Sequence, residues 1–193
     1  MSRTQEFEPA EALQKAMEVF WEKGYGNSSM DDIVTRTGVS RYGLYGEFGS
    51  KKELYRAALE HYCHQNIETR LAGLARPDAG VQDVKDFFMG ALAHCQCEEG
   101  RLGCMLCYTS VELGIEEEEM AEFVNTAFGK MRAALRHALQ NAKQREEVPS
   151  DLDVAETADF LTGIIMGLST MARSAMDPQL MKNFVKGGLA RLG

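Results

Sequence analysis

The sequence predicts an all-α protein, in which an N-terminal head of three helices is joined by a long helix to a larger helical body. Apolar residues recur at helical spacing along most of the chain, and no alternating strand pattern interrupts them. Gly38 can end one short helix and Ser40 can begin another after Val39 alone, which is the spacing of a helix-turn-helix. No Gly or Pro occurs between Ser50 and Gly73, so one helix of about 23 residues can connect the head to the body.

Two helices precede the turn in the head. The first is expected over residues 9–23, where apolar residues repeat at helical spacing until Gly24. The second is expected to begin after Ser28 or Ser29, which are suitable N-cap residues, and to continue to Thr37. Their apolar faces supply the core of a small N-terminal domain.

The short helix after the turn is suited to a close approach to another molecule. It carries Arg41, Tyr42 and Tyr45 around the small residues Gly43 and Gly46. In helix-turn-helix proteins the second helix of the motif lies in the major groove of DNA. The sequence therefore predicts that this helix reads DNA.

The charge distribution is consistent with a DNA-binding head on an acidic protein. The net charge is −8 at pH 7, yet residues 36–56 contain five basic residues against two acidic ones. Ser50 and Glu53 have the spacing of a capping box, and Lys51 and Lys52 fall in the first turn of the helix that it opens. Lysines are unfavourable at the positive end of a helix dipole, which indicates that an anion lies nearby.

The head contains a specific combination of residues at fixed spacing. It consists of Gly38-Val39-Ser40, Leu44-Tyr45, Phe48 and Ser50-Lys51-Lys52-Glu53-Leu54, preceded by Gly24-Tyr25 and Asp32-Ile33. This combination resembles the DNA-reading segment of the TetR/AcrR family of bacterial repressors. The resemblance covers about the first third of the chain, and the remainder is similar in helical character and length.

The resemblance implies two domains. Residues 1–50 would form the helix-turn-helix DNA-binding domain, and residues 51–193 the helical ligand-binding and dimerisation domain, with the connector over about residues 50–72. It also implies that a homodimer represses transcription at a palindromic operator in double-stranded DNA. A small apolar or aromatic inducer would then release the DNA.

The same resemblance assigns the expected DNA contacts. Tyr45 and Lys51 match positions that hold phosphates in the family. This chain has Gly46-Glu47 where the family usually has histidine preceded by an aromatic residue or arginine. Glu47 either repels phosphate or accepts a hydrogen bond from a cytosine amino group, and the favoured interpretation places it in solvent or beside an arginine. The residues at the groove-facing end of the reading helix are Ser40, Arg41, Tyr42 and Gly43.

Five further helices are expected in the body, over about residues 81–97, 103–114, 117–144, 151–174 and 178–191. Eight of the 11 methionines lie between Met89 and Met181, and flexible apolar side chains suit an adaptable pocket. Taken singly, such residues more often fill a helical core, so the pocket depends on the resemblance. The expected ligand-binding residues are Phe88, Leu92, Met105, Tyr108, Phe128, Met131, Phe160 and Ile164.

The last two helices are expected to form the homodimer interface. The helix over residues 151–174 is too apolar for a helix with a solvated face, and its small residues allow close approach of another helix. The helix after Pro178 is similar, so two helices from each subunit can form a four-helix bundle. The alternative is that both helices are internal core. The expected interface is centred on Leu161, Ile164, Leu168 and Phe184.

Four cysteines and a histidine lie within fourteen residues: His94, Cys95, Cys97, Cys104 and Cys107. Cys104 and Cys107 are one helical turn apart on the same helix face. A tetrahedral thiolate site would require the preceding helix to unwind near Cys97. The favoured interpretation is that these cysteines are small buried apolar residues, and the alternative is a thiol- or metal-responsive repressor.

Other function classes have less support. The chain has no Gly-x-Ser-x-Gly, no His-Glu-x-x-His and no phosphate-binding glycine loop, so no enzyme is predicted. His61 and His64 have a spacing compatible with a metal pair, but hydrogen-bonded histidines are more common, and neither metal nor cofactor is expected. The odd number of cysteines, with no signal segment and no apolar membrane span, favours the cytoplasm. A helical interaction protein without DNA binding is the alternative of another class.

Overall fold

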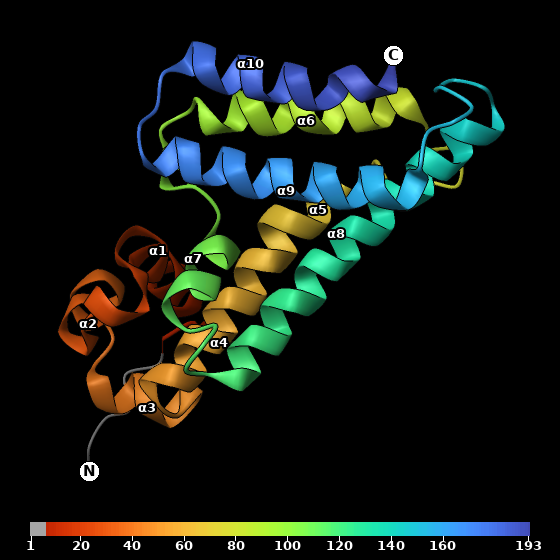
Figure 1. Ribbon diagram of the computed structural model, residues 1–193. Helices are drawn as coiled ribbons and strands as arrows, with labels where there is room; N and C mark the ends of the chain where they lie inside the picture. Colours follow the sequence, from red (N-terminus) through yellow and green to blue (C-terminus); the bar gives the residue numbers. More distant parts are fainter. Residues whose placement is uncertain (1–6) are drawn as a thin grey trace.

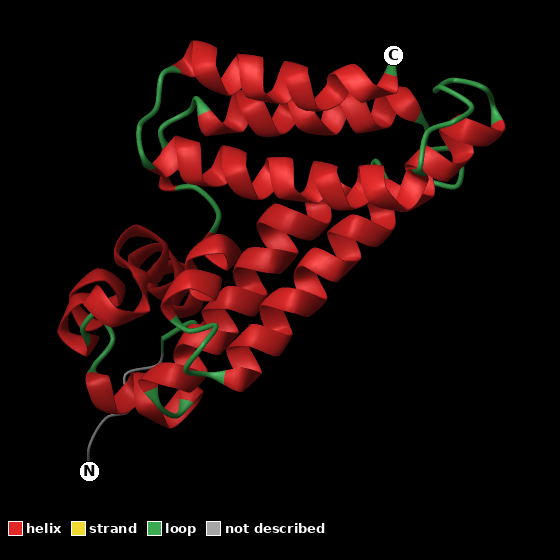
Figure 2. Ribbon diagram, in the orientation of Figure 1, coloured by secondary structure: helices red, strands yellow, loops and turns green. Residues whose placement is uncertain are grey.

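The computed structural model describes residues 7–193, and every regular element in this range is helical (Figures 1 and 2). The predicted all-α fold class is confirmed, and none of the described helices is long and apolar enough to cross a membrane. The elements are α1 (Pro9–Asn27), α2 (Met30–Thr37), α3 (Arg41–Phe48), α4 (Lys51–Tyr62), η1 (Cys63–Glu68), α5 (Thr69–Leu71), α6 (Val81–Cys95), η2 (Glu99–Leu102), α7 (Met105–Glu112), α8 (Glu118–Gln144), α9 (Val154–Arg173), α10 (Pro178–Leu189) and η3 (Ala190–Leu192).

Local caps fix the turns of the head, which is formed by α1, α2 and α3. Ser29 and Asp32 form a capping box at the start of α2, and Gly38 ends α2 with a φ of 74°. Glycine adopts this left-handed conformation without the steric cost of a Cβ atom. Ser40 then caps α3 by accepting a hydrogen bond of 3.1 Å from the Gly43 N–H. The helix-turn-helix therefore consists of α2 and α3.

The first helix is longer than expected, because the chain kinks at Gly24 and then continues to Asn27. Gly24 has a φ of 81°, and a Cβ atom added to it would lie 2.5 Å from a carboxylate oxygen of Glu112. That carboxylate accepts a hydrogen bond of 2.8 Å from the Tyr25 N–H. The kink is therefore a contact between the head and α7, as well as a break in the helix.

The predicted connector is one helical rod made of α4, η1 and α5. Ser50 and Glu53 form the expected capping box at its start. The backbone stays helical throughout, but Cys63–Glu68 has the wider π-helical hydrogen-bond pattern. Such π segments inside α-helices occur frequently at functional sites.

In the body, α8 lies beside the connector, and α6, α9 and α10 stack across the far end of both (Figure 1). The segment between α6 and α7 differs from the prediction, since α6 ends at Cys95 and α7 begins only at Met105. The chain turns back tightly between them. Gly100 packs so closely on the His94 carbonyl group that no Cβ atom fits there, and Gly103 has a φ of 73°.

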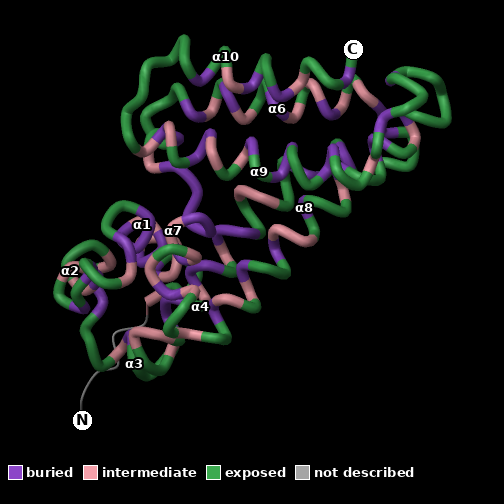
Figure 3. Tube along the Cα trace, viewed as in Figure 1, coloured by how far each residue is buried: buried purple, intermediate pink, exposed green. Residues whose placement is uncertain are grey.

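The buried apolar residues of the described chain (Figure 3) belong to two apolar cores. One joins the three head helices to α4, α7 and the first half of α8, and the other joins α5, α6, α9, α10 and the second half of α8. The head thus shares a continuous core with α7 and the start of α8. Its orientation depends on those two helices, although the predicted domain boundary lies near residue 50.

Candidate DNA-reading surface and effector pocket

The helix α3 presents aromatic side chains on its open face. Tyr42 is 88% exposed and Tyr45 is 40% exposed, while Leu44 is fully buried and anchors α3 to the head. Gly43 does not face outward with them, because a Cβ atom on it would lie 3.1 Å from a Val39 methyl group and 3.4 Å from the Phe7 ring. Its role is close packing within the head, and the exposed face of α3 is aromatic.

The basic residues of the head are held by acidic residues of the same chain. Arg41 on α3 forms an ion pair of 2.8 Å with Asp31 on α2, and Lys52 pairs with Glu117 just before α8. Further pairs join Arg36 to Glu18 and Glu22, and Arg56 to Glu60 and Glu119. Each pair is partly exposed and adds little stability. Together they compensate the local basic excess that the sequence shows.

Lys51 is anchored within the head. Its Nζ atom donates a hydrogen bond of 2.6 Å to the Tyr25 carbonyl oxygen and lies 4.4 Å from the centroid of the Tyr25 ring. Burial lowers the pKa of Lys51, while the charges of Glu112 and Asp32 raise it. Lys51 therefore ties the start of the connector to the end of α1. In contrast, Glu47 is exposed on α3.

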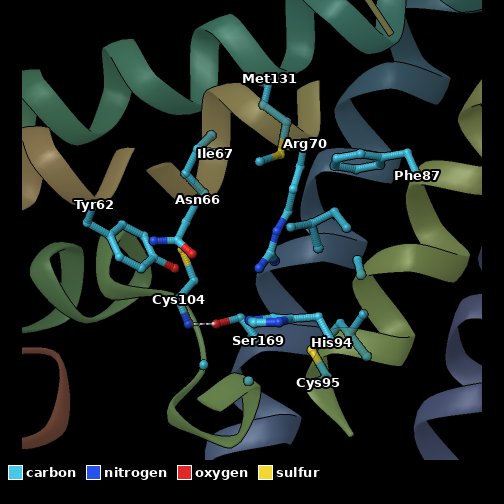
Figure 4. A pocket seen from close by; sticks show the side chains of 15 residues that line it. Tyr62, Asn66, Ile67, Arg70, Phe87, His94, Cys95, Cys104, Met131 and Ser169 are labelled. Carbon is cyan, nitrogen blue, oxygen red and sulfur yellow. Dashed lines mark hydrogen bonds between the residues drawn. The ribbon is translucent and has the colours of Figure 1, made fainter. Parts of the chain in front are cut away.

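A cavity of about 60 Å³ lies where the connector, α6, α8, α9 and the loop before α7 meet (Figure 4). This volume accommodates about five water-sized groups. Arg70 extends into the cavity from the connector, toward His94 and Ser169. The lining residues are Tyr62, Asn66, Ile67, Arg70, Phe87, Ala91, His94, Cys95, Gly100, Gly103, Cys104, Met131, Ile165, Leu168 and Ser169.

The cavity is lined by different faces of the helices from those that the sequence indicated. Of the expected ligand-binding residues, only Met131 lines it. On α6 the cavity is lined by Phe87 and not by Phe88, which packs in the core. On α9 it is lined by Ile165 and not by Ile164, which packs in the core. Periodicity identifies a buried helix face, but it does not tell which edge of that face borders a cavity.

The other expected ligand-binding residues also lie outside the cavity lining. Leu92 is in the core of the body, and Met105 and Phe128 pack in the core shared with the head. Phe160 is 41% exposed on the outer face of α9, with the Arg191 guanidinium 4.9 Å from its ring centroid. The Tyr108 ring lies 4.1 Å from the guanidinium of Arg173.

Four residues of the connector, Tyr62, Asn66, Ile67 and Arg70, line the cavity and were not predicted as ligand contacts. Tyr62, Asn66 and Arg70 are spaced four residues apart, so they lie on one helix face. A sequence signal for this cavity face was available, since Asn66 and Arg70 are two polar residues one helical turn apart on a helix that packs against both the head and the body. Ser169 of α9, which also lines the cavity, has no comparable sequence signal.

The two histidines of the connector contact different partners. His61 Nε2 lies 2.8 Å from Gln14 Oε1, and His64 Nδ1 lies 3.1 Å from a carboxylate oxygen of Glu68. Within residues 7–193, no group of three or more His, Cys, Asp or Glu side chains is arranged to hold a metal ion.

The cysteines occupy different environments. Cys95 and Cys104 both line the cavity (Figure 4). Cys97 is exposed, with its Sγ atom 3.6 Å from His94 Nδ1. Cys63 is buried in the core shared with the head, where burial raises its pKa to about 12. The four clustered cysteines of the sequence therefore do not converge on one point.

Cys104 and Cys107 form a pair at the start of α7. Cys104 is the N-cap residue of the helix, with extended backbone angles. Hydrogen bonds from the Cys107 thiol, from the N–H groups of Cys107 and Leu106 and from the Tyr62 hydroxyl lower the pKa of Cys104. The hydrogen bond to Cys104, together with burial, raises the pKa of Cys107. Such donors favour the thiolate, which is the nucleophilic form of cysteine.

The cavity wall is hydrogen-bonded to the head. Trp21 on α1 donates from Nε1 to the Gly103 carbonyl oxygen at 3.0 Å. The next residue, Cys104, donates its N–H to Ser169 Oγ at 2.6 Å. Arg173, one turn further along α9, donates to the Trp21 carbonyl oxygen at 3.0 Å. A displacement of this wall therefore acts directly on α1.

Comparison with known families matches both parts of the chain. Residues 12–58 match the family described as bacterial regulatory proteins, tetR family, and residues 80–187 match the tetracyclin repressor-like C-terminal domain. The chain belongs to the TetR family. It is therefore a transcriptional regulator that binds DNA, and not an enzyme.

Relatives in the TetR family cover most of the chain. The HTH-type transcriptional repressor ComR of Escherichia coli (strain K12) is 30% identical over 172 residues, which are 89% of this chain and 82% of that relative. YezE of Bacillus subtilis (strain 168), an uncharacterised HTH-type regulator, is 25% identical over the whole of both chains. A cysteine mutant of the TetR-family regulator CifR, solved with 26 bp operator DNA, has a TM-score of 0.85 at 26% identity and covers 97% of this chain and 98% of its own.

In this TetR-family chain, the residues expected at the centre of the dimer interface lie mostly inside the subunit. Leu161, Ile164 and Leu168 are at most 5% exposed, because α6, α8 and α10 cover that face of α9. They are core residues and have no surface to offer a partner. Phe184 is half-buried and lines a surface groove with Leu180.

The outer side of α9 and α10 carries other apolar residues. Phe160 and Met166 of α9 are 41% and 36% exposed, and Leu180 of α10 is 47% exposed. Gly163 lies between the first two with no neighbouring atom within 4 Å of where its Cβ would be. The apolar residues that the sequence indicated on α9 and α10 therefore form two faces. One face is buried within the subunit, and the other is partly exposed.

Proposed function

We propose that this TetR-family regulator is a repressor that binds a palindromic operator as a homodimer and releases it when a small inducer enters the cavity. The observation that carries the proposal is the hydrogen bond from Trp21 to Gly103, because it joins the DNA-binding head to the cavity wall. Two comparisons support it, since ComR is named a repressor and CifR was solved with operator DNA. A protein that acts on chromosomal DNA works in the cytoplasm.

The proposed reading face is the exposed side of α3, with Tyr42 and Tyr45 outward and Ser40 and Arg41 at its start. Phosphates compete with Asp31 for Arg41 when DNA is bound, because that ion pair is exposed. Lys51 contributes positive charge at the start of the connector and contacts phosphate only after leaving the Tyr25 carbonyl oxygen.

The proposed inducer has an apolar body and one polar group. Ile67, Phe87 and Met131 supply apolar contacts, while Arg70 and Ser169 supply polar ones. The cavity is small as it stands, and a molecule of aromatic size enters by moving the long Arg70 side chain aside. A molecule in this space also contacts the Gly103–Cys104 wall, which is hydrogen-bonded to Trp21, and this contact couples inducer binding to DNA release.

The proposed dimer uses the outer face of α9 and α10. Phe160, Gly163, Met166, Leu180 and Phe184 form an apolar strip whose glycine permits close approach of a second helix. Two copies of this strip, related by a two-fold axis, make a four-helix bundle. Two heads are required because a palindromic operator presents two half-sites.

The test is a gel-shift measurement with DNA that flanks the gene. The proposal expects sequence-selective binding that weakens as salt is raised, and an Arg41→Ala variant that loses part of the selectivity. A library of small aromatic and aliphatic acids, alcohols and amides can then be screened for release, with an Arg70→Met variant as the pocket control. Binding that is equally strong on unrelated DNA, or absent, contradicts the proposal and favours a helical interaction protein.

A second candidate effector is an oxidant or other thiol-reactive molecule. The specific observation in its favour is that Cys104 lines the cavity while accepting hydrogen bonds that lower its pKa. In this alternative, the regulator responds to chemical modification of Cys104 in the cavity wall and not to a molecule bound in the cavity.

A further inference from the structure

The segment Cys104-Met105-Leu106-Cys107 has the spacing of a dithiol redox motif at the start of a helix. Cys104 is the N-cap of α7, and Cys107 lies in the first turn behind it. The two thiol groups are close enough for each to shift the pKa of the other, which is lowered at Cys104 and raised at Cys107. A Cys-x-x-Cys pair at a helix N-terminus is an arrangement in which the first cysteine is a nucleophile and the second can form a disulfide with it.

The two cysteines differ in their position relative to the cavity. Cys104 lines the cavity, whereas Cys107 is not among the cavity residues and lies behind Cys104 against Ser169. The cavity volume of about 60 Å³ admits a molecule of a few heavy atoms. Its polar wall on the Cys104 side consists of the Tyr62 hydroxyl and the side chains of Asn66 and Ser169 (Figure 4).

We propose that Cys104 and Cys107 are a reversible dithiol–disulfide pair, oxidised by a small hydroperoxide that reaches Cys104 through the cavity. The chemistry of the pair is independent of the repressor function, but its effect on DNA binding rests on the proposed function above.

The reaction has two steps. The Cys104 thiolate attacks the terminal peroxide oxygen of ROOH, the O–O bond breaks, and the products are a sulfenic acid on Cys104 and ROH after protonation of the alkoxide. The Cys107 sulfur then attacks the Cys104 sulfur, the S–O bond breaks, and the hydroxide leaves as water with the Cys107 proton. In total, two thiols lose two electrons and two protons, and ROOH becomes ROH and water.

The other cysteines are less suited to either step. Cys95 also lines the cavity, but burial raises its pKa to about 11, so it remains a thiol. Cys63 is buried away from the cavity in the core shared with the head. Cys97 is exposed and can be oxidised from solvent, but it lies outside the cavity. The hydrogen-bond donors around Cys104 therefore select it as the nucleophile.

The disulfide would form next to the contact with the head. Cys104 follows Gly103, whose carbonyl oxygen accepts the hydrogen bond from Trp21. Bond formation draws the Cys104 sulfur toward Cys107 and away from the Tyr62 hydroxyl, while the Cys104 N–H is held by Ser169. The strain falls on the Gly103–Cys104 wall, so oxidation is expected to displace α1 and weaken operator binding.

The experiment uses the reduced full-length protein, treated with one equivalent of hydrogen peroxide or tert-butyl hydroperoxide. Trypsin cleaves after Arg101 and Lys130, so residues 102–130 form one peptide that contains Cys104 and Cys107 and no other cysteine. We expect this peptide to lose two hydrogen masses and operator affinity to fall by about tenfold. Dithiothreitol should restore both.

Variants separate the roles of the two thiols. Cys104→Ser should abolish peroxide-dependent loss of DNA binding, and Cys107→Ser should leave a sulfenic acid on Cys104 that dimedone traps. Cys97→Ser is the matched control, since it removes an exposed thiol and should respond like the wild type. Failure of the 102–130 peptide to form a disulfide, while another thiol pair oxidises or none does, overturns the proposal.

DNA binding is scored separately from the thiol chemistry. A disulfide in the 102–130 peptide that leaves operator affinity unchanged overturns the switch, because the cavity wall then does not control the head. A protein that never binds an operator contradicts the proposed function, and in that case the peptide mass alone decides whether the dithiol pair exists.

Discussion

At the scale of single residues, the structure changes the interpretation of the basic head. The sequence places five basic residues against two acidic ones over residues 36–56. The fold brings acidic partners to them from other elements, and Arg41 on the reading helix is paired with Asp31 on α2. If Arg41 contacts DNA as proposed, a phosphate or base must compete with the Asp31 carboxylate for it.

The Arg41–Asp31 pair gives the first prediction. Asp31→Asn removes the competing carboxylate, and operator affinity should rise by up to about fivefold, since an exposed pair is worth up to about 1 kcal/mol. The salt dependence of binding should steepen because Arg41 is free to neutralise phosphate. Gel-shift titrations at several salt concentrations measure both effects.

The matched control is Asp78→Asn, which removes the same charge from an exposed pair with Arg76, outside the head and outside α9 and α10. It should leave operator affinity within experimental error. Equal affinity of the Asp31→Asn variant and the wild type would show that Arg41 does not contact DNA.

At the scale of elements, α7 is the part that joins the cavity to the head. Its first turn contains Cys104 and Cys107, and the carbonyl group of Gly103 just before it accepts from Trp21. Its last residue, Glu112, holds the Tyr25 N–H beside the kink at Gly24. Both ends of one short helix therefore contact α1, so a movement of α7 is expected to rotate the head and not merely loosen it.

The Trp21 contact gives the second prediction. Trp21→Phe removes the donor to Gly103 and part of a fully packed side chain, and the free energy of unfolding should fall by about 2 kcal/mol. Urea unfolding followed by circular dichroism measures this change. Trp21 is the single tryptophan of the chain, so fluorescence is not available for the variant.

The control for Trp21→Phe is Tyr42→Phe, which removes one donor from a side chain that is 88% exposed. Its unfolding curve should match the wild type. If the two variants are equally stable, the contact between α1 and the cavity wall carries no energy, and the coupling between head and cavity has to be sought elsewhere.

At the scale of the whole molecule, the open face of α9 and α10 is the remaining apolar surface that the proposed function uses. Phe160, Met166 and Leu180 are partly exposed there, and the subunit does not cover them. The residues expected at the interface, Leu161 and Leu168, serve instead as core. A charge at either would disrupt folding and would not report on association.

The dimer gives the third prediction. Met166→Arg places a charge on the open face of α9 without touching the core, so the variant should fold, sediment as a monomer and lose operator binding by at least about a hundredfold. Analytical ultracentrifugation and gel shift measure the two outcomes. Met89→Arg on α6, where Met89 is 55% exposed, is the matched control and should remain dimeric. A dimeric Met166→Arg variant would place the interface on another face.

Much of the fold can be predicted because the information is local. Gly38, Ser29 and Ser50 set helix ends through their own backbone preference or their own capping hydrogen bonds, which involve residues three or four positions away. The helix-turn-helix and the connector follow from such signals. The exception is a place where a contact distant in sequence sets the backbone conformation, namely the kink at Gly24, which Glu112 holds.

The sequence by itself determined the all-α class, the order of the helices and the place of the helix-turn-helix, because each depends on interactions within a few residues along the chain. Only the tertiary structure decided which helix faces border the cavity, since Phe87 and Phe88 are equally apolar and differ by one step of helix rotation. It also decided that Arg41 meets Asp31 and that Cys104 lies in the cavity beside Tyr62, because those contacts join segments whose distance in space is fixed by the packing of the whole chain.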